Sequence, residues 1–442
     1  MTEENILMAT SLLKDIDGLV QANIISSDTA QRIITYYQQK KETAPDKLNI
    51  ILGILGAMLV GSGIILIVAH NWDELSRPFK TTLSFIPLLL AQLLCAYTLI
   101  KQKRSAAWRE SSGVLLFFAV GTSISLISQI YQVSGSLSGF LLTWVLLTLP
   151  LIYLLSSALV SLLCIAAITW YACITGYFES TDSIPYMYAV TIAGIIPFYY
   201  KLYQAKKNSN YIHLLNWFLS LSLIIVLGAF TKDTDTWYDW VFALYLLVLC
   251  IYYFTGRSAS FAEKKLFANP FLFIGVGGIL FILFIWSFDF LWKEYEPARN
   301  VYELLFNPLS WLVVVALIIA ILSGRKNFQH QTIKLFDPTG FSSAVFLVTL
   351  LLQGQYVPAA VFIINIWVMG IALFFILKGA KANHLGILNF GLIIIAILAI
   401  CRFFDDQIPF IWRGIFFVAA GAGFFIANYL MLRKRKQLNT KP

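Results

Sequence analysis

Residues 50–69 read IILGILGAMLVGSGIILIVA, twenty positions without a charged side chain. A helix needs about 20 apolar residues to cross the hydrocarbon core of a bilayer. Runs of this kind recur to the end of the chain, and we place spans at residues 50–69, 80–100, 112–131, 138–155, 157–177, 184–203, 211–230, 237–255, 269–291, 308–323, 340–353, 356–377, 384–401 and 411–432. The division of 138–177 rests on Ser156-Ser157 alone, and 340–353 is short. The sequence therefore predicts an all-α, polytopic transmembrane helical bundle of about 14 spans.

The composition supports a membrane protein over a soluble one. Of the 442 residues, 59% are hydrophobic and only 12% are charged, whereas a soluble domain is about 45–50% apolar and about 25% charged. The five cysteines all fall inside apolar runs and form no CxxC pair, so neither a disulfide framework nor a zinc site is indicated. We expect membrane lipid as the surroundings and no cofactor.

The placement of positive charge predicts the orientation. Twenty of the 32 Lys and Arg residues fall in the even-numbered connections and the C-terminal tail, against seven in the odd-numbered ones. Cytoplasmic connections carry the excess of Lys and Arg, and the alternation stays in phase to the end of the chain. We therefore expect an even span number, with both termini in the cytoplasm. The net charge of +9 is explained by this pattern, so no nucleic acid is expected.

Three segments follow from the spans: a head at 1–48, the transmembrane bundle at 49–432 and a basic cytoplasmic tail at 433–442. The head has two runs with helical spacing of apolar residues, so it is predicted to be a small cytoplasmic helical hairpin. Asp28, with Gln31 three residues later, suits a capping box at the second helix. A hairpin of this size cannot hold a large core alone. We expect the head to bind the membrane domain, a second copy or a cytoplasmic protein.

Polar residues follow the first predicted span in the order His70-Asn71-Trp72-Asp73-Glu74. Histidine can relay a proton or bind a ligand, whereas Trp at the headgroup level beside polar helix-end residues is the ordinary interfacial arrangement. We take His70, Asn71 and Trp72 as pocket candidates and Asp73 and Glu74 as weaker candidates, with an interfacial cap as the alternative.

The third predicted span ends in Gln129, Tyr131 and Gln132. Such groups are costly against lipid, so they should face the bundle interior or a wet cavity. Hydrogen bonding between helices explains them as well as ligand contact does. We include all three as pocket candidates.

Two arginines, Arg402 and Arg413, fall on the predicted outer side, against the positive-inside trend. Asp405 stands at the right spacing to pair with Arg402 if the helix continues. Asp289 is a weaker outer-edge candidate. A structural ion pair and an anion-binding role are the alternatives. Because all these candidates map to the outer third of the membrane, we predict an outward-facing polar pocket.

The residues now quoted resemble those of a known family. Ile25-Ser26 to Ala30 in the head, Asn71-Trp72, Gln129-Ile130-Tyr131, Arg402-Phe403-Phe404-Asp405 and Arg413-Gly414 are similar to segments of the bacterial membrane proteins grouped as domain of unknown function 2157. The resemblance is strongest over the head and the first four spans. It implies a protein of the bacterial cytoplasmic (inner) membrane and supplies no activity.

Three functions remain open from the sequence. The favoured one is a transporter-like protein whose outward-facing pocket takes a small or anionic solute. The second is a membrane-embedded enzyme acting on a lipid-linked substrate, with Asp73 or Glu74 as acid or base. The third is a sensor or scaffold that signals through residues 1–48. The chain shows no Walker, GxGxxG, HExxH or GxSxG motif, so we assign no catalytic residue and no metal ligand, and favour a protein that is not an enzyme.

Overall fold

The structure is a computed structural model. It describes residues 16, 20, 22, 24–42, 72–178, 184–207, 209–231, 238–258, 261, 264, 266–293, 311, 315, 318, 319, 322, 337–352 and 357–403, together with single positions between 411 and 425. The chain forms two compact units, residues 1–82 and residues 83–442.

In the smaller unit, the second predicted head helix is present as α2 (Ser27–Glu42). Its first turn is capped by Ser26, whose Oγ accepts a hydrogen bond from the Thr29 backbone N–H at 3.3 Å. The predicted capping pair of Asp28 and Gln31 is therefore wrong, because Ser26 already stands at the capping position. Asp28 instead pairs with Arg32, 3.2 Å away on the exposed surface.

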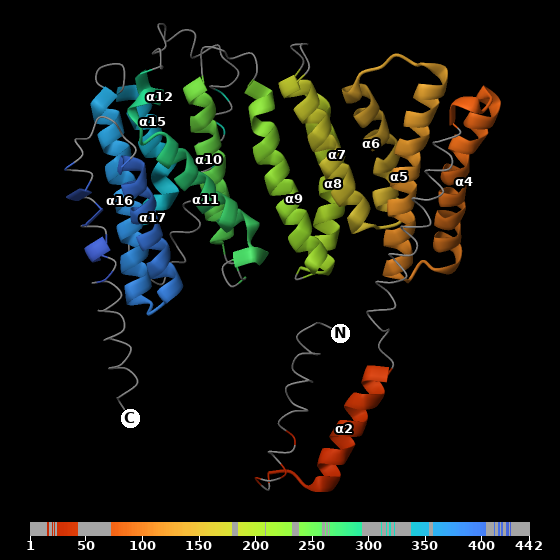
Figure 1. The fold of residues 1–442 in the computed structure, drawn as a ribbon, viewed down its shortest axis with the longest axis horizontal. Helices are drawn as coiled ribbons and strands as arrows, with labels where there is room; N and C mark the ends of the chain where they lie inside the picture. The colour runs from red at the N-terminus through yellow and green to blue at the C-terminus, as the bar shows by residue number, and fades with distance from the viewer. Residues whose placement is uncertain are drawn as a thin grey trace. The chain divides into compact units, whose positions relative to one another are not determined.

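The larger unit is a row of helices that run alternately up and down (Figure 1). In chain order these are α4 (Arg77–Lys101), whose first turn belongs to the smaller unit, α5 (Ala106–Tyr131), α6 (Leu137–Leu154), α7 (Ala158–Cys173) with the π-helical turn η2 (Ile174–Phe178), α8 (Tyr186–Ala205), α9 (Asn210–Leu227) with η3 (Gly228–Thr231), α10 (Tyr238–Gly256), η4 (Leu266–Ala268), α11 (Pro270–Ile285), α12 (Asp289–Lys293), η5 (Pro338–Phe341), α15 (Ser342–Leu352), α16 (Val357–Lys381) and α17 (Leu385–Phe403).

Seven of the described helices are long and apolar enough to cross a membrane: Arg77–Lys101, Ala106–Tyr131, Leu137–Leu154, Ala158–Phe178, Asn210–Phe230, Val357–Lys381 and Leu385–Phe403. Three shorter apolar helices accompany them, at Val241–Gly256, Pro270–Ile285 and Pro338–Leu350. The described residues form helices and no strand, so the predicted all-α, multi-pass membrane class is confirmed. Predicted spans 50–69, most of 308–323 and most of 411–432 lie outside the described residues, so the number of about 14 stays a prediction.

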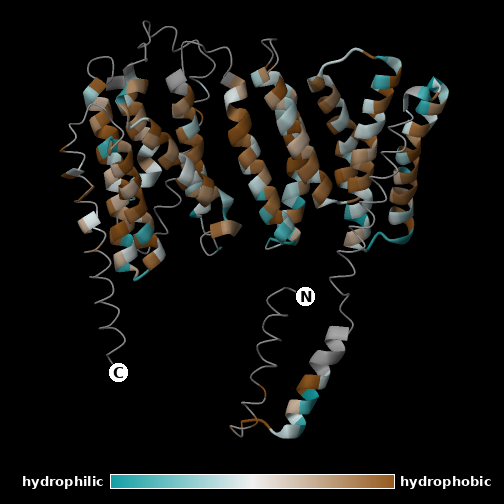
Figure 2. Ribbon diagram, in the orientation of Figure 1, coloured by the Kyte–Doolittle hydropathy of each residue, from teal (hydrophilic) through white to brown (hydrophobic). Residues whose placement is uncertain are grey.

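Hydrophobic residues predominate along the helices of the larger unit (Figure 2). Large hydrophobic side chains point outward along it, among them Leu93 at 67%, Ile100 at 76%, Phe281 at 66% and Phe362 at 65% exposure. In water each such side chain would forgo about 1.5–3 kcal/mol of burial energy. Lipid receives this surface at no such cost.

Basic residues of the larger unit gather at one edge, which we call the basic edge. They lie at helix ends and connections where α4, α8, α10 and α16 finish, at the lower side of Figure 1. The described members are Lys101, Lys103, Arg104, Arg109, Lys201, Lys206, Lys207, Arg257, Lys264, Lys378 and Lys381. Arg402, near the end of α17, and Lys293, at the end of α12, lie at the opposite edge. The separation of charge expected from the sequence is therefore present among these helices.

Glu110 of α5 holds the start of α7 at the basic edge. Its buried carboxylate accepts hydrogen bonds from Ser157 Oγ, from Ala158 N at 3.0 Å and from Leu159 N at 2.9 Å. A negative charge is favourable at this helix end, where the first N–H groups lack partners within the helix. The predicted division between 138–155 and 157–177 is thus confirmed: α6 ends at Leu154 and α7 begins at Ala158.

The helices pack around two main apolar cores. One is built mainly from α5 to α9, and the other from α10, α11, α12, α15, α16 and α17. Close approach within the second core depends on glycine: a Cβ on Gly275 would lie 2.7 Å from Tyr253 N, and one on Gly391 would lie 2.7 Å from Ala372 O. Small residues let membrane helices approach closely in this way.

Candidate functional site

The span predicted at 269–291 is interrupted after α11. Ser287 N and Phe288 N donate to the carbonyls of Phe284 and Ile285, three residues back, at 3.2 and 3.3 Å. The Ser287 hydroxyl also donates to Phe284 O, at 2.6 Å. A serine that bonds the preceding turn competes with the helical ladder. The chain therefore leaves the helix at Trp286–Phe288 and resumes in the short helix α12, so the predicted span is interrupted between α11 and α12.

The interruption is fixed by aromatic packing. Trp292 of α12 donates its indole N–H to Trp286 O at 2.8 Å. The two rings meet nearly perpendicularly at 4.7 Å, and Phe346 of α15 packs on Trp286 at 5.2 Å. Both indoles are only 1% exposed. The broken segment is therefore tightly packed into the core.

Arg402, in the last turn of α17, reaches this segment. Its Nη2 donates to Ser287 Oγ at 3.0 Å. Its guanidinium carbon lies 4.8 Å from the centre of the Phe288 ring, within the range of a cation–π interaction. The side chain is half-buried. A permanent positive charge is thus held at the edge opposite the basic edge.

Asn365 of α16 completes the group, which we call the Arg402 site: Trp286, Ser287, Phe288, Asn365 and Arg402. Asn365 Nδ2 donates to Ser287 O at 3.1 Å and to Val361 O at 2.8 Å. Two buried polar atoms of the site, Asn365 Oδ1 and Trp286 Nε1, have no hydrogen-bond partner among the residues that the structure describes. The site thus combines a cation with an acceptor and a donor that still have bonding capacity.

Asp289, a predicted candidate, begins α12 two residues after Ser287, so it belongs to the same segment that Arg402 contacts. Gln129, Tyr131 and Gln132 lie elsewhere, at the end of α5. Gln132 takes the left-handed conformation, with φ 51°, as is common where a helix closes. The three side chains are exposed, and α5 and α17 lie at opposite ends of the row (Figure 1). The structure does not bring them to Arg402.

Trp72 and Glu74 belong to the smaller unit, in the turn η1 (Trp72–Glu74). Lys80 Nζ lies 5.6 Å from the centre of the Trp72 ring, and Glu74 is exposed. The remaining candidates, His70, Asn71, Asp405, Arg413 and the side chain of Asp73, lie outside the described residues. Whether these five residues contribute to a pocket therefore stays a prediction.

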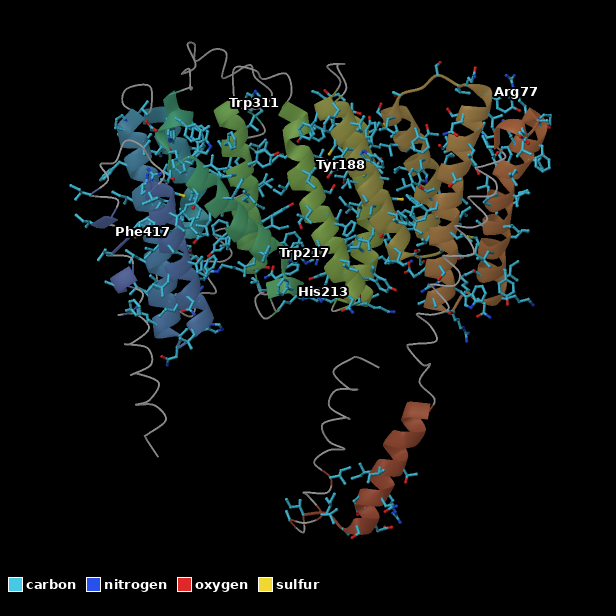
Figure 3. The ribbon with its side chains drawn as sticks, in the orientation of Figure 1. Arg77, Tyr188, His213, Trp217, Trp311 and Phe417 are labelled. Atoms are coloured by element: carbon cyan, nitrogen blue, oxygen red, sulfur yellow. The ribbon has the colours of Figure 1, made fainter. Side chains whose placement is uncertain are left out.

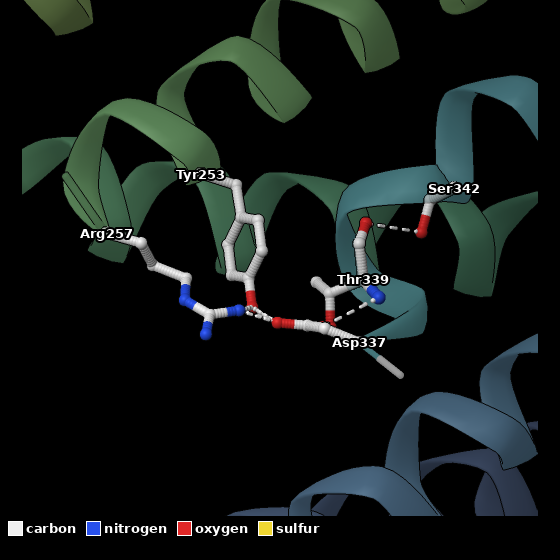
Figure 4. Close-up of polar contacts among 5 residues, drawn as sticks. All are labelled: Tyr253, Arg257, Asp337, Thr339 and Ser342. Carbon is white, nitrogen blue, oxygen red and sulfur yellow. Dashed lines mark hydrogen bonds and ion pairs between the residues drawn. The ribbon is translucent and has the colours of Figure 1, made fainter. Parts of the chain in front are cut away.

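A second polar cluster lies at the basic edge (Figure 4). Arg257 at the end of α10 forms an ion pair with Asp337, and Tyr253 donates its hydroxyl to the same carboxylate. The other carboxylate oxygen accepts from Thr339 N at 3.1 Å and caps η5. Asp337 is 5% exposed, and both of its oxygens are engaged. This cluster fastens α10 to the start of α15.

The sequence analysis did not single out four residues that join helices in the structure: Ser287, Asn365, Glu110 and Asp337. Asn365 carried a usable signal, since a lone Asn in an apolar run is costly in lipid and calls for a partner. Asp337 stands before Pro338, as an N-cap followed by a proline does. No three His, Cys, Asp or Glu side chains among the described residues converge to hold a metal ion.

Part of the chain matches a known protein family. Residues 17–161 match the model of a family described as a predicted membrane protein, DUF2157. The resemblance predicted from the sequence is thereby confirmed over these residues. The chain is a multi-pass membrane protein, and the Arg402 site lies beyond the matched residues. No curated protein and no solved structure matches the chain.

Proposed function

We propose that this chain is a transporter-like protein of the bacterial cytoplasmic membrane that binds a small anionic solute at the Arg402 site. The observation that carries the proposal is the interrupted span between α11 and α12, to which Arg402 donates a hydrogen bond. Many membrane transporters build their substrate sites where a transmembrane helix is interrupted. An arginine within a span is costly unless it serves a ligand or a structural partner.

The chemistry of the site favours an anion. A guanidinium presents a planar fork of donors that matches carboxylate and phosphate oxygens. The Trp286 indole can add a further N–H donor, and Asn365 Oδ1 can accept a hydrogen bond from a hydroxyl or amine elsewhere on the solute. The Arg402 site therefore suits a small anion that also carries a donor, such as a hydroxy acid or an amino acid.

The charge pattern supports an outward-facing site. The basic edge is the cytoplasmic side by the positive-inside rule, so the end of α17 that holds Arg402 faces outward. An even number of spans then leaves both termini in the cytoplasm. This orientation is part of the proposal.

A thermal-shift screen with the purified protein tests the proposal. We expect one or more small carboxylates or phosphates to raise the Tm of the wild type and neutral polyols to leave it unchanged. Arg402→Gln should weaken the apparent affinity about tenfold or more, because a charged hydrogen-bonding partner is lost. The matched control is Arg104→Gln, which removes an exposed arginine at the basic edge and should leave affinity unchanged. The anion found is then offered to proteoliposomes as a transport substrate.

Two results would overturn the proposal. One is a screen in which no anion stabilises the protein, or in which Arg402→Gln binds as tightly as the wild type. The other is an anion that binds through Arg402 but does not cross the proteoliposome membrane. That second result would point to a receptor or an enzyme that uses the same site.

A further inference from the structure

The connection between α10 and α11 folds against the neighbouring helix α9 at the basic edge. Trp217 of α9 donates its indole N–H to Phe267 O at 2.9 Å. Asn269 Nδ2 donates to Gly256 O at 2.7 Å and to Phe261 O at 3.2 Å. These bonds hold the connection close to the first turns of α9, where Figure 3 shows His213 and Trp217. Lys264 is part of this connection and therefore lies near the start of α9.

Three basic side chains, those of Lys207, His213 and Lys264, lie in this region. Lys264 Nζ lies 5.0 Å from the centre of the Phe261 ring, and Lys207 Nζ lies 5.8 Å from the centre of the Tyr203 ring at the end of α8. Lys264 is near enough to Lys207 and to His213 for their charges to interact. Among the described residues, the cluster has no carboxylate paired with its positive charges.

Several side-chain nitrogens in this region also lack a hydrogen-bond partner. Lys264 Nζ, His213 Nδ1 and Asn216 Nδ2 are buried and have no hydrogen-bond partner among the described residues. Asn216 is 0% exposed. Its Oδ1 accepts from Tyr199 OH at 2.7 Å, and the Tyr199 ring stacks on Tyr203 at 6.1 Å. Such unmatched buried atoms are unusual, because buried polar atoms in proteins are nearly always paired.

The titration of Lys264 agrees with this geometry. Burial lowers the pKa of Lys264, Tyr203 opposes that shift, and the like charge of Lys207 lowers it further. Both burial and the neighbouring like charge therefore act against the ammonium form of Lys264. An anion among these groups would relieve both the unmatched donors and the repulsion between charges.

We propose that Lys207, His213, Asn216 and Lys264 bind a phosphate group. A phosphate offers several acceptor oxygens to ammonium, imidazole and amide donors at once. The cluster lies between helices at the basic edge, where anionic lipid headgroups collect and where basic pockets between helices bind them. The phosphate belongs either to an anionic lipid or to a soluble phosphorylated molecule. This site is separate from the Arg402 site.

The test uses the full chain, purified and reconstituted in nanodiscs of the zwitterionic lipid phosphatidylcholine. Inorganic phosphate and phosphatidylglycerol are titrated separately while the Tm is followed. We expect the wild type to be stabilised by several degrees, and Lys264→Gln to shift the half-saturating concentration about tenfold or more upward. The matched control is Lys103→Gln, an exposed lysine at the same edge with the same loss of charge. It should behave as the wild type.

A second variant guards against loss of the fold. His213→Gln keeps a side chain that can donate a hydrogen bond and should retain the unliganded Tm while weakening the response. Stabilisation by phosphatidylglycerol alone assigns a lipid ligand, stabilisation by phosphate alone assigns a soluble ligand, and stabilisation by both assigns the phosphate group itself. The proposal is overturned if neither additive stabilises the wild type. It is equally overturned if Lys103→Gln loses as much as Lys264→Gln, because the effect would then be general surface electrostatics.

Discussion

Glu110 offers the sharpest test of how this bundle is held together. The carboxylate is 7% exposed and crosses from α5 to the start of α7. There it accepts from one hydroxyl, Ser157 Oγ, and from two backbone N–H groups, those of Ala158 and Leu159. Replacing Glu110 by Ala removes all three acceptor contacts. Replacing it by Gln keeps the shape and one carbonyl oxygen but removes the charge.

The magnitude follows from what each variant leaves unmatched. A buried N–H that loses its acceptor costs about 1–3 kcal/mol, and hydrogen bonds to a charged group contribute about 1.5–3 kcal/mol each. The charge at the helix N-terminus adds about 0.3–1 kcal/mol. These terms share one carboxylate and do not add fully. We expect Glu110→Ala to lower the free energy of unfolding by about 3–5 kcal/mol, and Glu110→Gln by about 1–2 kcal/mol.

Reversible unfolding of the purified protein in mixed micelles, followed by tryptophan fluorescence, measures these values. Glu74→Gln serves as the control, because Glu74 is exposed and its charge should matter little. A double-mutant cycle of Glu110→Gln with Ser157→Ala should give a coupling energy of about 0.5–3 kcal/mol. Equal stabilities of Glu110→Ala and the control, or a coupling near zero, would refute the reasoning.

Three further outcomes follow from the same contacts. Asp337→Asn should cost about 3–5 kcal/mol in the same unfolding assay, because it leaves a partly buried guanidinium without its carboxylate; a loss below 1 kcal/mol would contradict this. Gly176→Val should lower the Tm sharply, since an added Cβ would lie 2.9 Å from the backbone of η3, whereas Gly135→Val, with nothing within 4 Å, should not. In intact cells, a membrane-impermeant maleimide should label Ser134→Cys but not Lys103→Cys; the reverse pattern would invert the proposed orientation.

The sequence was sufficient for the class of fold, because lipid imposes a length and a composition on each span. The division at Ser156-Ser157 could be predicted for the same reason: two runs of span length need a polar link between them. The interruption at Ser287 could not, since Trp286 and Phe288 are as apolar as the helix before them. What breaks the helix is the Ser287 hydroxyl bonding the preceding turn, together with packing by Trp292 and Phe346. The packing by Phe346 joins residues distant in the sequence, and the local contacts leave no mark on the hydropathy of the run.

The pocket prediction shows a similar limit. Gln129 and Arg402 shared an expected membrane depth, and depth alone suggested that they line one cavity. The depth of a residue in the membrane does not say which residues lie beside it. That depends on which helices are neighbours in the row. With α5 and α17 at opposite ends of that row (Figure 1), equal depth does not bring them into contact. Only the link between Arg402 and the segment of Asp289 was within reach of the sequence, because both are ionisable groups predicted at the outer edge and their charges are opposite.

Some buried polar groups of the described residues have all their oxygens hydrogen-bonded, and others keep an atom without a partner. We assign a structural role to the first kind and a ligand-binding role to the second. The carboxylates of Glu110 and Asp337 have engaged oxygens and join helices, so their whole bonding capacity goes into stability. The amides of Asn365 and Asn216 each keep a buried atom unmatched among the described residues. Each unmatched atom costs about 1–3 kcal/mol, while total stability is only about 5–15 kcal/mol. A marginally stable bundle can tolerate an unmatched polar atom if a bound ligand supplies the missing hydrogen bond. The two proposed sites are therefore centred on these amides and the cations beside them.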